Sequence, residues 1–142
     1  MAIAKTFREL EVYNLARSET QRIFELTKAF PRDERFSLTD QIRRSSRAVG
    51  AMIAAAWAPR RYKAAFISKL DEALEEAMET QAWLDHSFDA GYLSKSEFDE
   101  RDLFWQRIGG ELVRMMDCAD ACWKLPPHHT NRPEPTRPDQ RQ

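Results

Sequence analysis

The strongest constraint on the fold is a helical periodicity of apolar residues that recurs in four successive segments. Apolar side chains repeat every three or four positions in residues 8–29, 37–58, 60–89 and 94–124, which places them on one face of an α-helix. The chain has only 4 glycines, and no stretch of useful length shows the alternation of a β-strand. The pattern predicts an all-α protein, an up-down-up-down antiparallel four-helix bundle.

Residues that start or stop a helix mark the ends of these segments. Pro31 closes the first one, because the residue before a proline is disfavoured in the helical conformation. Ser37 is a suitable N-cap for the second, and Gly91 is a natural stop for the third. Ser94 and Glu97 have the spacing of a capping box, which predicts the start of the fourth helix.

The apolar faces of the four segments predict the hydrophobic core. The fourth face advances in steps of three and four residues with one longer step near its start, which is close to the 3.5-residue repeat of nearly antiparallel packing. The predicted core residues are Val12, Ala16, Ile23, Thr27, Phe30, Leu38, Ile42, Ser45, Val49, Met52, Ile53, Ala56, Tyr62, Phe66, Leu70, Ala73, Leu74, Ala77, Leu84, Phe88, Phe98, Trp105, Ile108, Leu112, Met115, Ala119 and Cys122.

We expect one domain, residues 1–124, because 142 residues suffice for a single sizeable core. Residues 125–142 contain five prolines and few apolar side chains, which predicts a disordered tail. No apolar run reaches the roughly 18 residues that a membrane span needs, and the N-terminus shows no export signal. The sequence thus predicts a cytoplasmic protein without membrane association, in which Cys118 and Cys122 are free thiols four residues apart on one helix.

Charge is distributed unevenly along the chain, although its net charge is −1. Residues 41–70 hold seven cations and no carboxylate, whereas residues 71–102 hold eleven carboxylates and two cations, a net charge of −9. A solvated helix commonly mixes both signs, and arginine suits phosphate and carboxylate groups. The basic stretch is therefore the candidate binding surface. Its candidate nucleic-acid contacts are Arg43, Arg44, Arg47, Arg60, Arg61 and Lys63.

Small and aromatic residues of the same stretch suggest how contact is made. Small residues on the outer side of the second helix allow another helix to approach closely and predict an oligomer contact. Trp57 and Tyr62 are candidates for base stacking. Packing at the bundle edge is the alternative for both, and it is favoured for Tyr62, which lies on the apolar face. The candidate oligomer contacts are Gly50, Ala51, Ala54 and Ala55.

Metal and catalytic sites have weaker support in the sequence. The carboxylates of the third helix point away from its apolar face, whereas a di-metal bundle needs inward Glu and His ligands. A zinc site at the cysteines and the tail histidines does not match common zinc spacings. No nucleophile motif or phosphate-binding loop is present, so we expect no enzyme activity and no cofactor. The residues weighed as ligands are Glu72, Glu75, Glu76, Glu79, His86, Cys118, Cys122, His128 and His129.

Three stretches of the chain carry a further pattern: "FRELEVYNLA", "FPRDERFSLTDQIRRSSRAVGAMIA" and "AAFISKLDEALEEAMETQAWL". They resemble the four-helix-bundle family of the 23S rRNA intervening-sequence proteins over residues 7–120, most specifically in Q-I-R-R and F-P-x-x-E. Where the family has Asn-Ile-Ala-Glu-Gly, this chain has Met-Ile-Ala-Ala-Ala at positions 52–56, so roles of those polar groups do not carry over. The matching residues are Phe7, Leu10, Val12, Tyr13, Phe30, Pro31, Glu34, Leu38, Gln41, Ile42, Arg43 and Arg44.

The resemblance implies a small bundle that assembles into a homopentamer, with no catalytic residue to transfer. Distant relatives are accessory proteins of diversity-generating retroelements, which implies RNA or DNA and a protein such as a reverse transcriptase as partners. Two functions remain open at this point. In the first, the basic surface binds nucleic-acid backbones. In the second, the protein is a purely structural assembly or protein-docking scaffold, and its arginines pair with acidic residues of the neighbouring subunit.

Overall fold

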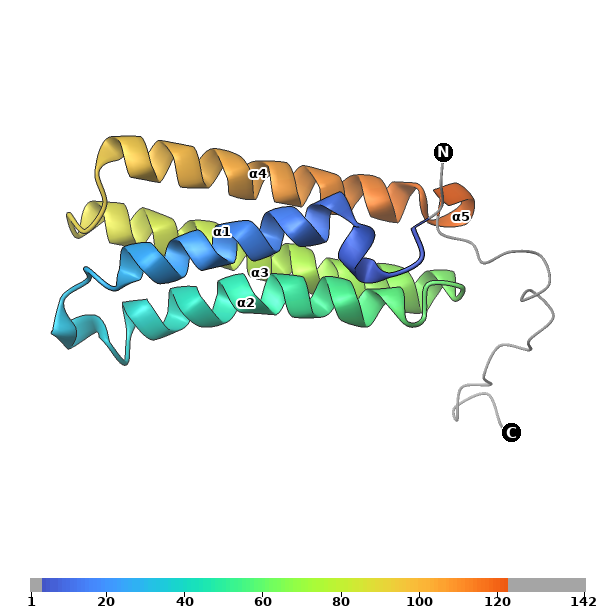
Figure 1. Cartoon of the computed structure of the whole chain (residues 1–142), viewed down its shortest axis with the longest axis horizontal. Coiled ribbons are helices and arrows are strands. Elements are labelled where there is room, and N and C mark those ends of the chain that lie inside the picture. Colours follow the sequence, from blue (N-terminus) through green and yellow to red (C-terminus); the bar gives the residue numbers. More distant parts are fainter. Residues whose placement is uncertain (1–3, 123–142) are drawn as a thin grey trace.

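The computed structural model describes residues 4–122, and within them the chain forms helices and no strand (Figure 1). The all-α prediction is confirmed. The long helices are α1 (Glu11–Thr27), α2 (Leu38–Trp57), α3 (Lys63–Asp89) and α4 (Lys95–Asp117). Short helical segments are η1 (Phe7–Glu9), η2 (Arg32–Glu34) and α5 (Ala119–Cys122).

The four long helices lie side by side along the length of the molecule, and each runs antiparallel to the next (Figure 1). Helix α1 packs against α2 and α4, and α3 packs against the same two helices, so the predicted bundle topology is confirmed. The contact between α2 and α3 is the most extensive of these four, and the contact between α1 and α4 is the least extensive. The α1–α4 seam is therefore where polar groups and solvent can enter the bundle most easily.

The predicted apolar faces meet in the core. Phe66, Leu70 and Trp105 are at most 1% exposed, and burial of each such side chain contributes roughly 1.5–3 kcal/mol. Phe88 is the main departure, because it lies in the last turn of α3, is 37% exposed and stacks on Phe98 with a ring-centre distance of 4.9 Å. Among the described residues, no helix has both the length and the apolar character needed to span a bilayer.

Of the helix-end signals that follow α1, those at Gly91 and Ser94 act as the sequence predicts, and the one at Ser37 does so only in position. Ser94 accepts a hydrogen bond from the Glu97 backbone N–H at 3.1 Å, and Gly91 after α3 has a φ of 81°, which glycine tolerates best. Ser37 does precede α2, but its hydroxyl donates to Glu34 Oε1 at 2.7 Å, and its oxygen accepts no hydrogen bond from the backbone N–H groups of the first turn. The first turn of α2 thus lacks the side-chain cap that the sequence predicts.

The fourth helix is shorter than predicted. It ends at Asp117, where Cys118 takes φ −94° and ψ 8°, and the separate helix α5 follows. The two cysteines are therefore not on one continuous helix. The prediction of free thiols is also wrong for Cys118, which is disulfide-bonded. The predicted tail, residues 125–142, lies outside the described residues.

Candidate nucleic-acid interface

Three cations surround one aromatic ring on the face between α1 and α2. Lys28 Nζ lies 4.9 Å from the centre of the half-buried Phe24 ring, and the guanidinium carbons of Arg43 and Arg47 lie 4.7 and 5.7 Å from it. The negative face of an aromatic ring attracts cations. The Phe24 ring therefore holds three positive charges close together. We call Phe24, Lys28, Arg43 and Arg47 the Phe24 cluster.

Arg43 is held in place by α1. Its Nε donates to Thr27 Oγ1 at 2.8 Å, and a terminal nitrogen donates to the Phe24 carbonyl oxygen at 3.5 Å. The guanidinium is therefore half-buried and turned toward α1, whereas the sequence places it on the outer side of α2. The physical reason is the length of the arginine stem, which covers apolar surface while the charged end reaches a partner.

The Phe24 cluster carries more positive charge than its neighbours neutralise. Lys28 pairs with Glu25 at 3.2 Å on the exposed surface. Within residues 4–122, no carboxylate oxygen lies within 4 Å of the guanidinium nitrogens of Arg43 or Arg47. Arg44 is exposed beside the cluster and approaches Asp40 only at 3.8 Å. Exposed pairs of this kind contribute about 0–1 kcal/mol, so an incoming anion can displace them.

The other candidate cations lie at the far end of α2 and are engaged there. An Arg60 terminal nitrogen donates to the Trp57 carbonyl oxygen at 2.9 Å, and its guanidinium carbon lies 4.1 Å from the centre of the Trp57 ring. Burial, followed by the charge of Arg61, lowers the pKa of Arg60. Lys63 Nζ lies 2.6 Å from Asp120 Oδ2. The single basic surface that the sequence predicts is therefore divided between the two ends of α2.

Arg60 and Arg61 lie against the two aromatic rings that the sequence suggests for base stacking. Trp57 is only 7% exposed beneath Arg60, so its ring has no open face for a base, and packing is the correct interpretation. The Arg61 guanidinium carbon lies 5.4 Å from the centre of the half-buried Tyr62 ring. Tyr62 is the N-cap residue of α3, which agrees with the packing role favoured from the sequence.

The small residues of α2 divide between an inner and an outer position. Gly50 faces α1, where a Cβ atom added to it would lie 3.7 Å from Tyr13 Cε2. Gly50 is half-buried beside α1 and therefore less outward than predicted. Ala51 and Ala55 are exposed and Ala54 is half-buried. All four stay predictions as oligomer contacts.

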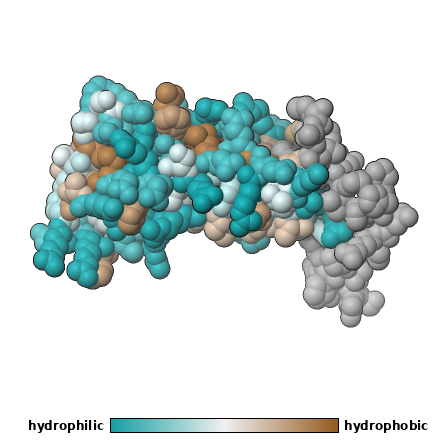
Figure 2. Space-filling model, in the orientation of Figure 1, coloured by the Kyte–Doolittle hydropathy of each residue, from teal (hydrophilic) through white to brown (hydrophobic). Residues whose placement is uncertain are grey.

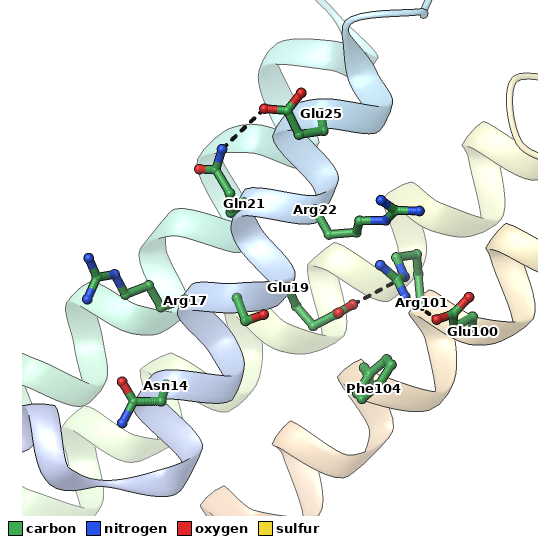
Figure 3. A pocket seen from close by; sticks show the side chains of 10 residues that line it. Asn14, Arg17, Glu19, Gln21, Arg22, Glu25, Glu100, Arg101 and Phe104 are labelled. Carbon is green, nitrogen blue, oxygen red and sulfur yellow. Dashed lines mark hydrogen bonds and ion pairs between the residues drawn. The ribbon is translucent and has the colours of Figure 1, made fainter.

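A buried ion pair in the seam between α1 and α4 escaped the sequence analysis. Arg101 Nε lies 3.4 Å from Glu19 Oε1, and the two side chains are 4% and 6% exposed. A terminal nitrogen of Arg101 also contacts Glu100 Oε1 at 2.9 Å. Burial raises the pKa of Glu19 to about 7, an effect that Arg101 opposes and Glu100 reinforces. Figure 3 shows Glu19 and Arg101 pointing toward one another across the seam.

The spacing of both residues in the sequence indicates a charge at a core position. Glu19 lies three residues after Ala16 and four before Ile23, on the apolar face of α1. Arg101 lies in the one long step of the α4 face, between Phe98 and Trp105. A charged residue at a core position needs an opposite charge on a neighbouring helix, and the bundle topology brings α1 beside α4.

The model of the 23S rRNA-intervening sequence protein family matches residues 8–114. The chain belongs to this family. The family assignment from the sequence motifs is thus confirmed over most of the bundle. None of the curated proteins compared with the chain matches it.

A solved structure supports the family assignment and the fold of this family member. It is described as a protein of unknown function from the S23 ribosomal protein family of Bacteroides thetaiotaomicron VPI-5482. It is 27% identical in sequence, with a TM-score of 0.67, and the match covers 75% of this chain and 95% of that chain. The similarity therefore extends over nearly the whole of the solved protein.

The acidic face of α3 has one perturbed carboxyl group in this family member. Burial, then the neighbouring Glu79 and Glu75, raise the pKa of the half-buried Glu76. Among residues 4–122, no three His, Cys, Asp or Glu side chains gather closely enough to hold a metal ion. The zinc alternative depends on His128 and His129, which lie outside the described part of the chain.

Proposed function

We propose that this protein is a non-enzymatic, cytoplasmic, homo-oligomeric four-helix bundle that binds the backbone phosphates of RNA or DNA. The Phe24 cluster and the adjacent Arg44 form the main contact. The observation that carries the proposal is the gathering of Arg43 and Arg47 on one ring without a carboxylate within 4 Å in the described chain. A polyanion supplies the charge that this surface lacks.

The geometry of Arg43 suits a phosphate ligand. Two of its N–H groups are used by Thr27 and the Phe24 carbonyl, so the guanidinium is already oriented and loses less conformational freedom on binding. Its other N–H groups make no hydrogen bond within residues 4–122. Charge-assisted hydrogen bonds from arginine to phosphate are stronger than neutral ones. Such contacts read no base sequence.

The cations at the far end of α2 take a secondary part. Arg47 lies about 15 Å from the end of α2 at Trp57, given a rise of 1.5 Å per residue. A nucleic-acid strand that lies along α2 can therefore reach Arg60, Arg61 and Lys63 after it contacts the Phe24 cluster. Lys63 would have to release Asp120 to take part, so its contribution should be the smallest.

The test compares two double variants that lose the same charge. Arg44→Gln/Arg47→Gln removes two exposed cations at the α1–α2 face, and Arg107→Gln/Arg114→Gln removes two exposed cations from α4. Fluorescence anisotropy with a labelled single-stranded RNA at low salt should show weaker binding of the first variant only. Arg43 is left in place because its hydrogen bonds to α1 support the fold. Equal affinities of the two variants would contradict the proposal.

Assembly without nucleic acid is the second candidate function. Ala51 and Ala55 are exposed on α2, and Met78 is 59% exposed between the exposed carboxylates Glu75 and Glu79 of α3. A head-to-tail ring, pentameric as the family resemblance implies, would place the basic side of one subunit against the acidic side of the next. Native mass spectrometry of the Met78→Glu variant tests this subunit contact. Dissociation of the oligomer into monomers supports the contact, and an unchanged oligomer rules it out. A protein partner would compete for the same faces.

A further inference from the structure

Helix α3 has one side that no other part of the described chain covers. It packs against α2, α4 and α5 and not against α1, which lies diagonally across the bundle (Figure 1). The side opposite α1 therefore faces outward, and exposed residues follow one another along it at the three- and four-residue spacing of a helix face. These residues form the outer side of α3: Asp71, Glu75, Met78, Ala82, Asp85 and Asp89.

Like charges lie next to one another on the outer side of α3. Asp71 and Glu75 are four residues apart, and so are Asp85 and Asp89. Like charges at this spacing destabilise a helix. Within residues 4–122, none of these four carboxylates pairs with a basic side chain. A cationic partner on this side would therefore relieve two repulsions.

Exposed carboxylates on the other side of the bundle already have cations. That side is mainly hydrophilic in Figure 2, and α1 forms part of it. On α1, Glu11 Oε1 lies 2.6 Å from a terminal nitrogen of Arg107, and Glu25 Oε2 lies 3.2 Å from Lys28 Nζ. The outer side of α3 differs because its negative charge is not paired by the described residues.

The sequence after α5 supplies cations close to this side. Helix α5 packs against α3 and α4, and Asp120 Oδ2 lies 2.6 Å from Lys63 Nζ, so the chain leaves α5 beside the first turn of α3. The C-terminal segment, residues 123–142, contains four cations and only two carboxylates. Its charge is therefore opposite to that of the outer side of α3. The cations are Lys124, Arg132, Arg137 and Arg141.

The length of the C-terminal segment matches the length of α3. Proline-rich sequences favour an extended conformation that advances about 3.1 Å per residue, and this segment contains five prolines. The ten residues from Cys122 to Arg132 can therefore span about 31 Å. Along α3, the twenty-two residues from Lys63 to Asp85 span about 33 Å at a rise of 1.5 Å per residue. Arg132 can thus reach the second like-charge pair.

We propose that the C-terminal segment docks along the outer side of α3 of the same chain. Lys124 meets the first like-charge pair and Arg132 meets the second. Pro126 and Pro127, which lie between them in the sequence, cover Met78, which is 59% exposed. Proline-rich segments suit such contacts because they are already extended and lose little conformational entropy on docking.

Attachment to α5 favours the segment of the same chain over that of a second copy. A short covalent connection gives a binding segment a high effective concentration at its site. The docked segment covers the side of α3 that a head-to-tail ring would use, so the two contacts exclude one another. The inference does not require the proposed phosphate contacts of the Phe24 cluster.

Photocross-linking in the full chain tests the proposal. The photoreactive residue p-benzoylphenylalanine replaces Met78, or Leu103 as the control, which is 66% exposed on α4. Gel electrophoresis separates single chains from linked pairs after irradiation, and mass spectrometry of the digested protein identifies the linked segment. The probe at position 78 should link to residues 123–142 within one chain, to the same extent at every protein concentration. The probe at position 103 should not.

Two double variants of the position 78 probe protein test the role of charge. Asp85→Asn/Asp89→Asn should lower the yield of the link severalfold. Glu25→Gln/Asp99→Asn removes two exposed carboxylates from α1 and α4 and should leave the yield unchanged. The link should also weaken in 1 M salt, where the Debye length is about 3 Å. Circular dichroism verifies that each variant is folded.

A link within one chain from position 78 to residues 123–142, weakened by the α3 variant alone, supports the proposal. A link between two chains shows that a second copy occupies the outer side of α3 and overturns it. No link at position 78, or equal links from positions 78 and 103, also overturns it, as does a yield that the two double variants change equally or not at all. The RNA assay of the Phe24 cluster is independent of each of these results.

Discussion

Replacement of Glu19 by Gln should remove a pH dependence from the stability of the bundle. Burial raises the pKa of Glu19 from 4.5 to about 7. Between these values the folded protein holds a proton that the unfolded chain releases, so stability falls as the pH rises through this window. At about 1.4 kcal/mol per pH unit, the effect amounts to about 3 kcal/mol of unfolding free energy. Below pH 4.5 the stabilising contribution is fully present, and above pH 7 it is lost.

Urea unfolding followed by circular dichroism at pH 5, 6, 7 and 8 measures this effect, at one protein concentration because assembly would change apparent stability. Gln is neutral throughout, so Glu19→Gln should match the wild type near pH 5 and become more stable by up to about 3 kcal/mol at pH 8. Glu76 also has a raised pKa, but it is present in both proteins and cancels in the difference. Glu100→Gln is the exposed control. A difference in unfolding free energy between Glu19→Gln and the wild type that does not change with pH refutes the reasoning. If the wild type instead becomes more stable than the variant as the pH rises, Arg101 stabilises the Glu19 carboxylate by more than burial destabilises it.

Three substitutions, with Leu103→Ala as the control for the third, test the packing account by the same urea assay. Gly110→Ala should stabilise α4 by about 1 kcal/mol, because the glycine is exposed and an added Cβ meets no atom within 4 Å; a loss of stability would reveal a contact on this face. Ser94→Ala should cost about 1 kcal/mol through loss of the hydrogen bond to the Glu97 backbone; no change would show that water replaces the cap. Leu70→Ala should cost about 2–5 kcal/mol because the side chain is fully buried, whereas Leu103→Ala, at a 66% exposed position, should cost little; similar costs would contradict the assigned core.

The bundle topology could be predicted because apolar periodicity reports on one helix at a time. Val12, Ile42 and Leu112 follow the helical repeat, and each is buried where the pattern places it. Fine detail at helix ends depends on competing local contacts. The hydroxyl of Ser37, for example, bonds to Glu34 in place of the helix. The break at Cys118 also has no clear signal, because the apolar repeat continues through it.

The candidate sites were less predictable because they depend on pairs of helices. The cationic stretch was evident, but only the α1–α2 packing brings Arg43 and Arg47 to Phe24. A long arginine side chain can turn toward a partner on another helix, and the apolar pattern of its own helix gives no information about that partner. The Glu19–Arg101 pair needed the same information, since the apolar spacing marks each residue as a charge at a core position but does not identify its partner on the other helix.

The salt dependence of RNA binding tests the central claim most directly. For single strands, each phosphate contact adds about 0.7 to the slope of log affinity against log salt concentration. If Arg44 and Arg47 each bind one phosphate, the Arg44→Gln/Arg47→Gln variant should show a slope about 1.4 units shallower than the wild type. The Arg107→Gln/Arg114→Gln control should keep the wild-type slope. Wild-type and Arg44→Gln/Arg47→Gln slopes that coincide, or a wild type that binds no RNA at low salt, would contradict a phosphate-binding role for the α1–α2 face.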